Sequence, residues 1–225
     1  MGLQDFTAFT KVDVGGHLTV NSATKITGDD VPRNADAYTY IDKGAAFFPA
    51  DFEIRFKAHY VASNNNFSYC QVCTVANLID DFQGIDTSGG DELTLGILQS
   101  TGYFWRLNEV DGGTVYSDNG GISLATDYWV RLVRDSGVGA DGTLYAYVYT
   151  DEYSTLDETL SVALQDSLSY RYLYAVQSVN SGGSQSLDLT VENMEVIVPS
   201  EGTGMMLLNP ANMRANRQRL SAGIQ

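Results

Sequence analysis

Apolar and polar residues alternate with a period of two through most of this sequence, a pattern that restricts the chain to folds built from β-strands. The alternation is clear in segments 51–61, 92–98, 103–110, 128–135, 143–150, 158–165, 170–179 and 186–198. Weaker candidates such as "HLTVN" and "AYTYID" bring the total to about a dozen strands. A chain of 225 residues is long enough for one large β domain with a substantial core. The sequence therefore predicts a large sandwich or barrel.

Asp-Gly pairs between apolar runs predict tight hairpins, because Gly adopts the positive φ of such turns without steric cost. These pairs occur in "EVDGGTVY" and "VGADGTLY", and "NSGGSQ" separates two long strands in a similar way. We expect the strands on either side of each turn to be antiparallel neighbours. Residues 5–198 contain no linker and no internal repeat.

After residue 198 the pattern changes: Pro199 ends the last strand, and the following residues combine an apolar run with arginines. Asn209 and Pro210 fit the N-cap and first position of a helix of about three turns, too short to be stable alone. We predict a sandwich domain over 1–198 and a partly helical arm over 199–225 that docks on another subunit. The alternative is a disordered terminus. The expected docking residues are Met205, Met206, Leu207, Leu208, Met213, Arg214, Arg217, Arg219 and Leu220.

The formal net charge of −15 argues against nucleic acid as a partner, since phosphate attracts basic surfaces. The arm carries about +2 and the rest about −17, so an acidic neighbour could pair with its arginines. The opening "MGLQDFTAFTKVDV" lacks the apolar run of a signal peptide, and no stretch approaches the ~20 apolar residues of a membrane span. We expect neither a signal peptide nor a membrane partner.

The second half of the chain resembles the concanavalin A-like lectin/glucanase sandwich of the laminin G-like kind. The resemblance rests on "TDYWVRLVRDSGVGADGTLYAYVYTDE" and "YRYLYAVQSVNSGGSQSLDLTVENMEV". In that family an aromatic and a basic residue precede a Gly turn, and a final strand returns beside the N-terminal strand. The matching positions are Tyr128, Trp129, Arg131, Arg134, Asp141, Gly142, Val191, Glu192 and Asn193. The resemblance implies an all-β, antiparallel two-sheet jelly-roll sandwich over about residues 5–198.

The concanavalin A-like fold occurs in hydrolases, lectins, protein-binding modules and accessory domains of phage structural proteins, so the fold alone does not select a function. With "AYTYIDKG", no signal peptide and a basic arm, the chain resembles bacteriophage virion proteins. We predict a non-enzymatic structural or surface accessory protein of a phage-like particle, of the capsid-decoration or fibre type. It would lie at the particle surface, attached through its arm to copies of itself or to other particle subunits. The alternative is a lectin-like module that binds cell-surface glycans.

A glycoside hydrolase is the less favoured function, because retaining enzymes need two carboxyl groups ~5 Å apart. Glucanases of the resembled family present them in a motif resembling E-x-D-x-x-E or E-x-D-x-E, which this sequence lacks. In the nearest run, "DLTVENME", Asp188 and Glu192 share a strand face and Glu195 lies on the other. The only histidines, His17 and His59, occur in no recognisable catalytic motif.

Two runs of alternate tyrosines, in "LYAYVY" and "YRYLYAV", each predict three rings on one strand face. On neighbouring strands they would form a platform for sugars, because Tyr combines a flat apolar face with a polar tip. The alternative is cross-strand packing. The candidate glycan-binding residues are Tyr145, Tyr147, Tyr149, Tyr170, Tyr172 and Tyr174.

The loop "IDDFQGIDTSGGDE" gathers acidic residues whose oxygens could bind calcium. The candidate ligands are Asp80, Asp81, Asp86, Asp91 and Glu92. Laminin G-like modules often bind calcium at a loop rim, so the resemblance implies the same here. The alternative is a solvated acidic loop. We expect no other cofactor.

The motif "SYCQVCTV" has the C-x-x-C spacing of zinc and redox sites but lacks their further ligands or helix. Residues three apart on a strand point to opposite faces, too far apart for a disulfide. We therefore predict that Cys70 and Cys73 are small, buried or half-buried residues.

Overall fold

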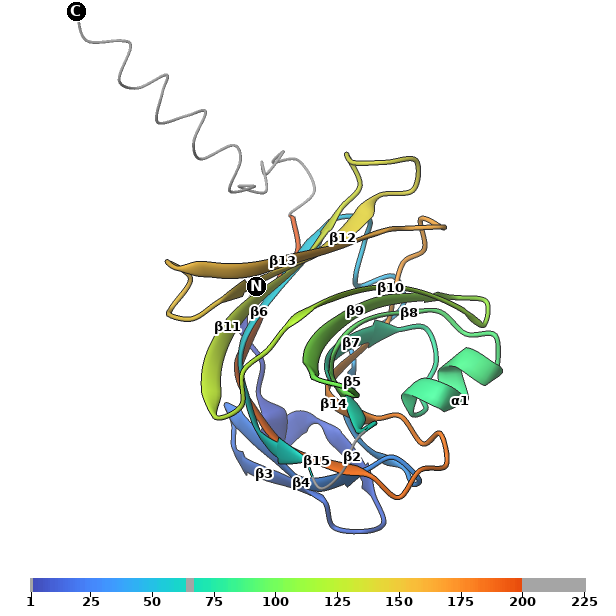
Figure 1. Cartoon of the computed structure of the whole chain (residues 1–225). Coiled ribbons are helices and arrows are strands. Elements are labelled where there is room, and N and C mark those ends of the chain that lie inside the picture. The colour runs from blue at the N-terminus through green and yellow to red at the C-terminus, as the bar shows by residue number, and fades with distance from the viewer. Residues whose placement is uncertain (1, 64–66, 200–225) are drawn as a thin grey trace, which may run out of the picture.

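The computed structural model describes residues 2–63 and 67–199 and consists of two antiparallel β-sheets packed face to face (Figure 1). The eight-stranded sheet runs in the order β13 (Leu156–Ala163), β12 (Thr143–Tyr149), β11 (Thr126–Asp135), β6 (Phe52–Ser63), β15 (Ser186–Ile197), β4 (Lys25–Pro32) and β3 (Leu18–Ser22), with β1 (Gly2–Leu3) beside β15. The seven-stranded sheet runs in the order β10 (Thr114–Gly121), β9 (Tyr103–Asp111), β8 (Glu92–Gln99), β7 (Tyr69–Ala76), β14 (Tyr172–Ser178), β5 (Ala37–Asp42) and β2 (Thr10–Asp13). The predicted all-β, antiparallel two-sheet sandwich is confirmed.

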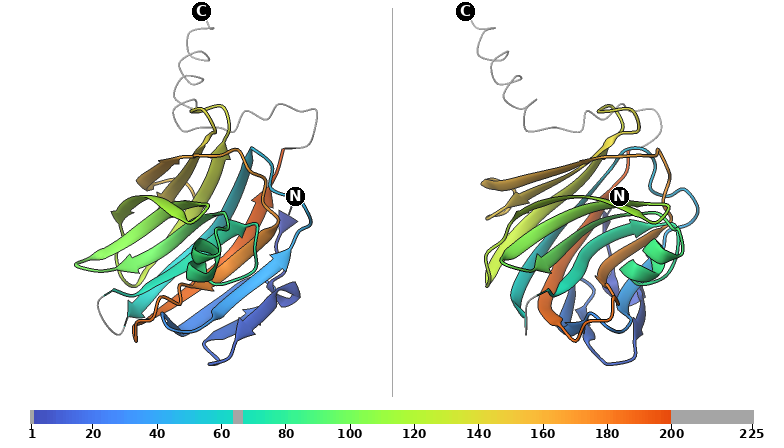
Figure 2. Two further views of the ribbon diagram at one scale, coloured as in Figure 1. Left: turned by 90° about the vertical axis from the view of Figure 1, so that its right-hand side faces the viewer. Right: turned by 45° about the vertical axis from the view of Figure 1, so that its right-hand side comes forward.

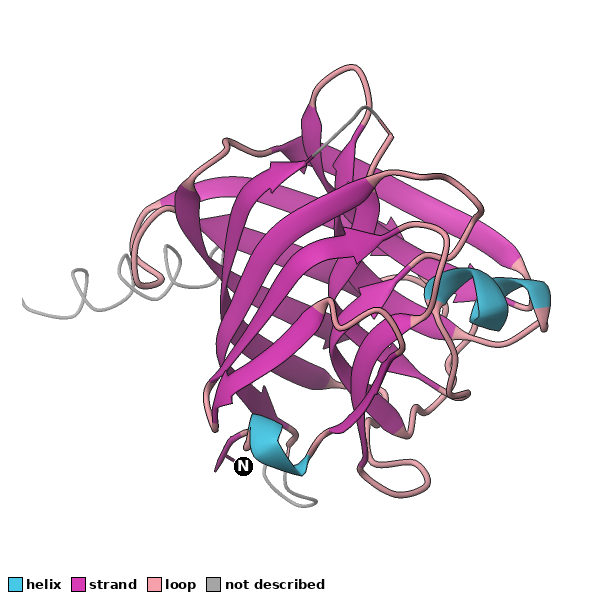
Figure 3. Ribbon diagram, turned by 90° about the horizontal axis from the view of Figure 1, so that it is seen from below, coloured by secondary structure: helices cyan, strands magenta, loops and turns pink. Residues whose placement is uncertain are grey.

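The core lies between the two sheets and is filled by alternate residues of their strands. Phe52, Ile54 and Phe56 of β6 and Trp105 and Leu107 of β9 have no exposed surface. Burying such a side chain stabilises a fold by about 1.5–3 kcal/mol, so the period-two pattern drives the layering. Helices are short in the described part of the chain, where Figure 3 shows strands almost throughout.

The final strand returns beside the N-terminus, as the resemblance implied. In β15, Val196 pairs with Gly2 and Glu195 pairs with Leu3, while β6 and β4 flank the same strand. The strand ends at Ile197. Apart from Pro199, the predicted arm and its docking residues lie outside the described residues.

Two of the three predicted hairpins are confirmed, and the third is wrong. β9 pairs with β10 across Gly112 and Gly113, whose φ values are 53° and 85°, and β11 pairs with β12 across Gly142, whose φ is 101°. The segment "NSGGSQ" instead crosses between the sheets, because β14 pairs with β7 and β5 whereas β15 pairs with β6 and β4. Both sides of each strand are already occupied, so β14 and β15 cannot be neighbours.

The seven-stranded sheet curves so that its outer face is concave, and a short helix lies against this face (Figure 1; Figure 2, left). The helix α1 (Phe82–Thr87) occupies part of the acidic segment predicted to be a loop. The Asp81 carboxylate caps it by accepting from the Gly84 amide, and Phe82 and Ile85 are buried. A second short helix, η1 (Phe6–Ala8), follows β1. Within the described residues, no helix is long and apolar enough to cross a membrane.

Cys70 and Cys73 are free thiols, fully buried, as predicted. They do not point to opposite faces, however, because the register of β7 against β8 shifts between Gln71 and Cys73. This bulge turns both sulfur-bearing side chains into the core between the sheets. Burial raises the pKa of the Cys70 thiol to about 12.

Candidate functional site

The concave face carries polar and aromatic side chains on its central strands. Tyr69 of β7, Thr94 of β8, and Arg106 and Asn108 of β9 face outward, because the residues that alternate with them belong to the core between the sheets. These four side chains lie across three adjacent strands.

Asn108 is the centre of a hydrogen-bond network on this face. It is fully buried, and its Nδ2 donates to Tyr69 Oη (2.6 Å) and Thr94 Oγ1 (2.8 Å). Its Oδ1 accepts from Arg106 Nε (3.1 Å). Burial raises the pKa of Tyr69, so its hydroxyl keeps its proton at neutral pH. Asn108 thus fixes both an aromatic ring and a guanidinium.

Gly96 of β8 allows these side chains to lie close to the sheet. It pairs with Arg106 of β9, and a Cβ atom at this position would come within 2.2 Å of Gln71 Oε1 and 2.8 Å of Tyr69 Cε2. Real Cβ atoms do not approach that closely. The glycine therefore leaves the space that Gln71 and Tyr69 occupy over β8.

A pocket of about 230 Å³ opens beside α1 on this face. Its lining residues are Arg33, Tyr69, Phe82, Gln83, Asp86, Arg106, Asn108, Val115, Val179 and Ser181. The rings of Tyr69 and Phe82 pack edge to face, with centroids 5.6 Å apart, and the Arg106 guanidinium lies 5.8 Å from the Tyr69 centroid. Aromatic walls and fixed polar groups therefore converge on one concave space, the usual composition of a small-molecule site.

Of these pocket residues the sequence singled out only Asp86, and that as a calcium ligand. One signal was present in "YFWRLNEV", where Arg106 and Asn108 share the strand face opposite Trp105 and Leu107. The alternation alone does not show that this face is concave or that α1 packs on it.

The two tyrosine runs do not form one platform, because β12 and β14 belong to different sheets. Tyr145 and Tyr147 stack at 5.8 Å on the outer face of the eight-stranded sheet, where Tyr149 packs with Tyr153. Tyr170 is buried in the core, since the chain enters β14 only at Tyr172. The first run shares one strand face as predicted, but the second run does not, and the two runs are not neighbours.

Tyr172 and Tyr174 do lie on the concave face, among Tyr38 and Tyr40. Tyr174 is fully buried, and its hydroxyl donates to the Leu78 carbonyl (2.9 Å), so it supports the segment that carries α1. Tyr172 is half-buried and accessible. A glycan-binding role for the six predicted tyrosines stays a prediction.

Asp80 and Asp81 meet a third carboxylate, Asp36, that the sequence did not suggest. One oxygen from each lies within 4.8 Å of the others, and Asn180 Nδ2 donates to Asp36 (2.7 Å) and Asp81 (3.4 Å). Burial, then the neighbouring carboxylates, raise the pKa of Asp81 to about 7. Such a trio has the oxygen ligands that a hard cation such as calcium prefers.

The other predicted calcium ligands do not join this trio. Asp86 lines the pocket beside α1, and Asp91 accepts from Asn77 Nδ2 (3.2 Å) and the Gly112 amide (3.1 Å). Glu92 is fully buried in β8, where Gln177 Nε2 donates to it (3.3 Å). Among the described residues, the five predicted ligands therefore do not gather in one cluster, and only Asp80 and Asp81 come together with a third carboxylate.

No protein-family model matches the sequence, and a search of curated proteins finds no match. Solved structures do match in fold. A legume lectin-like domain from Entamoeba histolytica has a TM-score of 0.58 at 11% identity, covering 89% of this chain and 97% of that one. A basic winged bean lectin has 0.55 at 9% identity, covering 88% and 95%, and the alginate lyase Aly36B has 0.54 at 15%, covering 86% and 88%. The protein has the concanavalin A-like lectin/glucanase fold.

In this concanavalin A-like sandwich, Asp188 and Glu192 share a strand face as expected from the sequence, but both are already paired. Glu195 was expected on the other face and is on the same one, because the register of β15 against β6 shifts between Glu192 and Glu195. Asp188 Oδ1 accepts from the Asp30 amide (2.7 Å), and Glu192 Oε1 accepts from Lys25 Nζ (2.7 Å). They belong to β15 of the eight-stranded sheet, whereas the pocket beside α1 lies on the other sheet.

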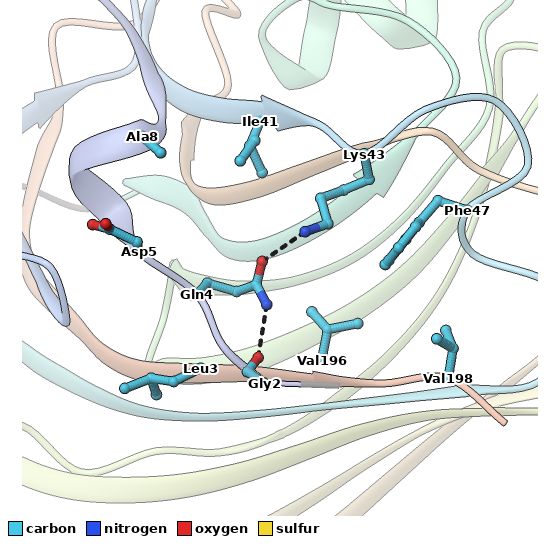
Figure 4. A pocket seen from close by; sticks show the side chains of 10 residues that line it. All are labelled: Gly2, Leu3, Gln4, Asp5, Ala8, Ile41, Lys43, Phe47, Val196 and Val198. Carbon is cyan, nitrogen blue, oxygen red and sulfur yellow. Dashed lines mark hydrogen bonds between the residues drawn. The ribbon is translucent and has the colours of Figure 1, made fainter. Parts of the chain in front are cut away.

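A second pocket of the concanavalin A-like sandwich, of about 390 Å³, lies beside the N-terminus (Figure 4). Its walls are largely aliphatic, with Ile41, Val196 and Val198 among them. Gln4 accepts from Lys43 Nζ (3.1 Å) and donates to the Gly2 carbonyl (2.8 Å). These polar groups bind one another within the pocket wall.

Proposed function

We propose that the protein is a carbohydrate-binding, lectin-like module whose ligand occupies the pocket beside α1 on the concave face. The observation that carries this proposal is the convergence of the Tyr69 and Phe82 rings with the Arg106 and Asn108 side chains. A sugar has apolar C–H faces that pack on rings and hydroxyls that need fixed polar partners. Solved proteins of the same fold include lectins and an alginate lyase, which supports a saccharide ligand.

Binding without hydrolysis fits this pocket better than glycoside cleavage. Asp86 is the one carboxylate among its lining residues, whereas glycosidases use a pair of carboxyl groups. The predicted particle-accessory function is compatible with this proposal, because a lectin at a particle surface would perform both.

A glycan array probed with Val115→Glu and Tyr116→Glu tests the proposal. The two residues are adjacent in β10 and equally exposed, at 37%, but only Val115 lines the pocket. The longer Val115→Glu side chain would fill the pocket, so we expect at least a tenfold loss of binding in this variant. Tyr116→Glu carries the same charge change and should bind as the unmodified protein does. Failure of the unmodified protein to bind any glycan, or equal loss in both variants, would contradict the proposal.

A further inference from the structure

We propose that the pocket beside α1 selects saccharides that carry a carboxylate, such as uronic or sialic acids, through Arg106 and Arg33. This inference rests on the proposed function and names its ligand class. The pocket would bind two kinds of group on one ligand, namely the carboxylate and the hydroxyl groups of an acidic sugar.

Arg33 and Arg106, together with Lys43 and Arg134, are the described Lys and Arg residues that form no ion pair. The protein has 28 acidic and 13 basic residues, so most basic groups should find a carboxylate. Among the described residues, ion pairs are formed by Lys11, Lys25, Arg55, Lys57, Arg131 and Arg171. Arg33 and Arg106 form none with a described carboxylate, although both line the same pocket. The pocket therefore carries two unpaired positive charges on a protein that is acidic as a whole.

Arg106 is held so that its outer end stays free for a ligand. Its Nε donates to Asn108 Oδ1 (3.1 Å) and its Nη2 to Ser117 Oγ (3.2 Å). Both hydrogens of Nη1 and the second hydrogen of Nη2 have no partner among the described residues. Adjacent donors on Nη1 and Nη2 match the two oxygens of a carboxylate.

Arg33 is held in the same manner from another part of the pocket wall. Its Nε donates to Ser181 Oγ (2.7 Å) and its Nη1 to the Phe67 carbonyl (2.6 Å). Its Nη2 keeps both hydrogens free of described partners. Because neutral groups hold both guanidiniums, their positive charges remain uncompensated and available to an anion.

Asp86 explains why the ligand would be an acidic sugar rather than a bare anion. Gln83 Nε2 donates to Asp86 Oδ2 (3.0 Å), but Asp86 Oδ1 is buried without a hydrogen-bond partner in the described structure. An unpaired buried acceptor is costly, so a rotation of the Asp86 side chain that turns Oδ1 into the pocket toward a sugar hydroxyl would be favourable. The pocket thus pairs donors for a carboxylate with an acceptor for a hydroxyl.

The test is titration calorimetry with a hexuronate oligosaccharide, with the same oligosaccharide after reduction of its carboxyl groups to alcohols, and with sialyllactose. Charge-assisted hydrogen bonds are stronger than neutral ones, so at least one of the two acidic ligands should bind roughly tenfold or more tightly than the reduced oligosaccharide. Comparison of the hexuronate oligosaccharide with sialyllactose identifies which kind of acidic sugar the pocket prefers. Arg106→Gln and Arg33→Gln should each reduce this preference. Arg171→Gln removes an equal charge outside the pocket and should leave the preference unchanged.

Equal affinity for the reduced and acidic oligosaccharides would overturn the inference and leave the proposed function intact. Tighter binding of a sulfated oligosaccharide than of either acidic ligand would also overturn it. Absence of binding to every glycan, acidic or neutral, would instead overturn the proposed function. The comparison of reduced and acidic ligands uses the unmodified protein, so the result does not depend on the folding of any variant.

Discussion

At the scale of single residues, Glu109 is a buried carboxyl group whose ionisation opposes folding. It is 1% exposed, and its oxygens accept from the Gln165 amide at 3.0 Å. Burial, with the nearby Asp111, raises the pKa of Glu109 to about 7. The folded protein therefore binds a proton that the unfolded chain has already lost, so this group stabilises the fold below pH ~4.3 and the contribution disappears as the pH rises to about 7.

We expect the free energy of unfolding to be higher at pH 5 than at pH 8, by up to about 3 kcal/mol from Glu109. Urea denaturation at the two pH values measures this difference. Glu109→Gln cannot ionise and should show a smaller difference, whereas Glu152→Gln, at an exposed position, should behave as the unmodified protein does. An undiminished pH difference in Glu109→Gln would show that another group causes it.

At the scale of elements, α1 depends on the sheet beneath it. With six residues it is too short to be stable alone, and Ile85 attaches it to Tyr38 and Tyr174 on the concave face. Ile85→Ala should lower the free energy of unfolding by about 2–5 kcal/mol. Because Phe82 and Asp86 of the same helix line the pocket, glycan affinity should fall as well.

Thermal unfolding and the glycan array measure these two effects, with Thr87→Ala as the matched change at an exposed position of α1. A lower melting temperature with unchanged affinity would mean that the pocket does not require α1.

The elements also show which features of the fold a sequence can predict. Alternation located most of the strands but not the largely exposed β10, and Asp-Gly turns located two hairpins, because both features act between residues close in the chain. Which sheet a strand joins depends on partners distant in the chain. The segment "NSGGSQ" therefore gave no indication that β14 and β15 belong to different sheets. The bulge near Cys73 and the meeting of Asp36 with Asp81 likewise arise only when strands pair. The candidate site was missed for the same reason, since it needs a concave sheet and a helix packed on it.

At the scale of the whole molecule, the sandwich and the arm are separable in the sequence. The last strand, β15, lies inside the eight-stranded sheet between β6 and β4 and ends at Ile197. Removal of residues 199–225 therefore takes away no described strand. The truncated chain should keep the melting temperature of the full chain, and its charge of about −17 should oppose self-association.

If the arm is an assembly device, light scattering at moderate salt should give a defined oligomer for the full chain and a monomer for residues 1–198. The three arginines of the arm would pair with carboxylates of an acidic neighbour, so the oligomer should weaken as salt rises, because salt screens charges beyond ~8 Å at physiological ionic strength. Apolar contacts of Met205 to Leu208 would resist salt, so residual association at high salt would assign the larger share of the binding to them. Equal masses for both chains would contradict self-assembly through the arm, and the particle-accessory function would then require a different partner subunit.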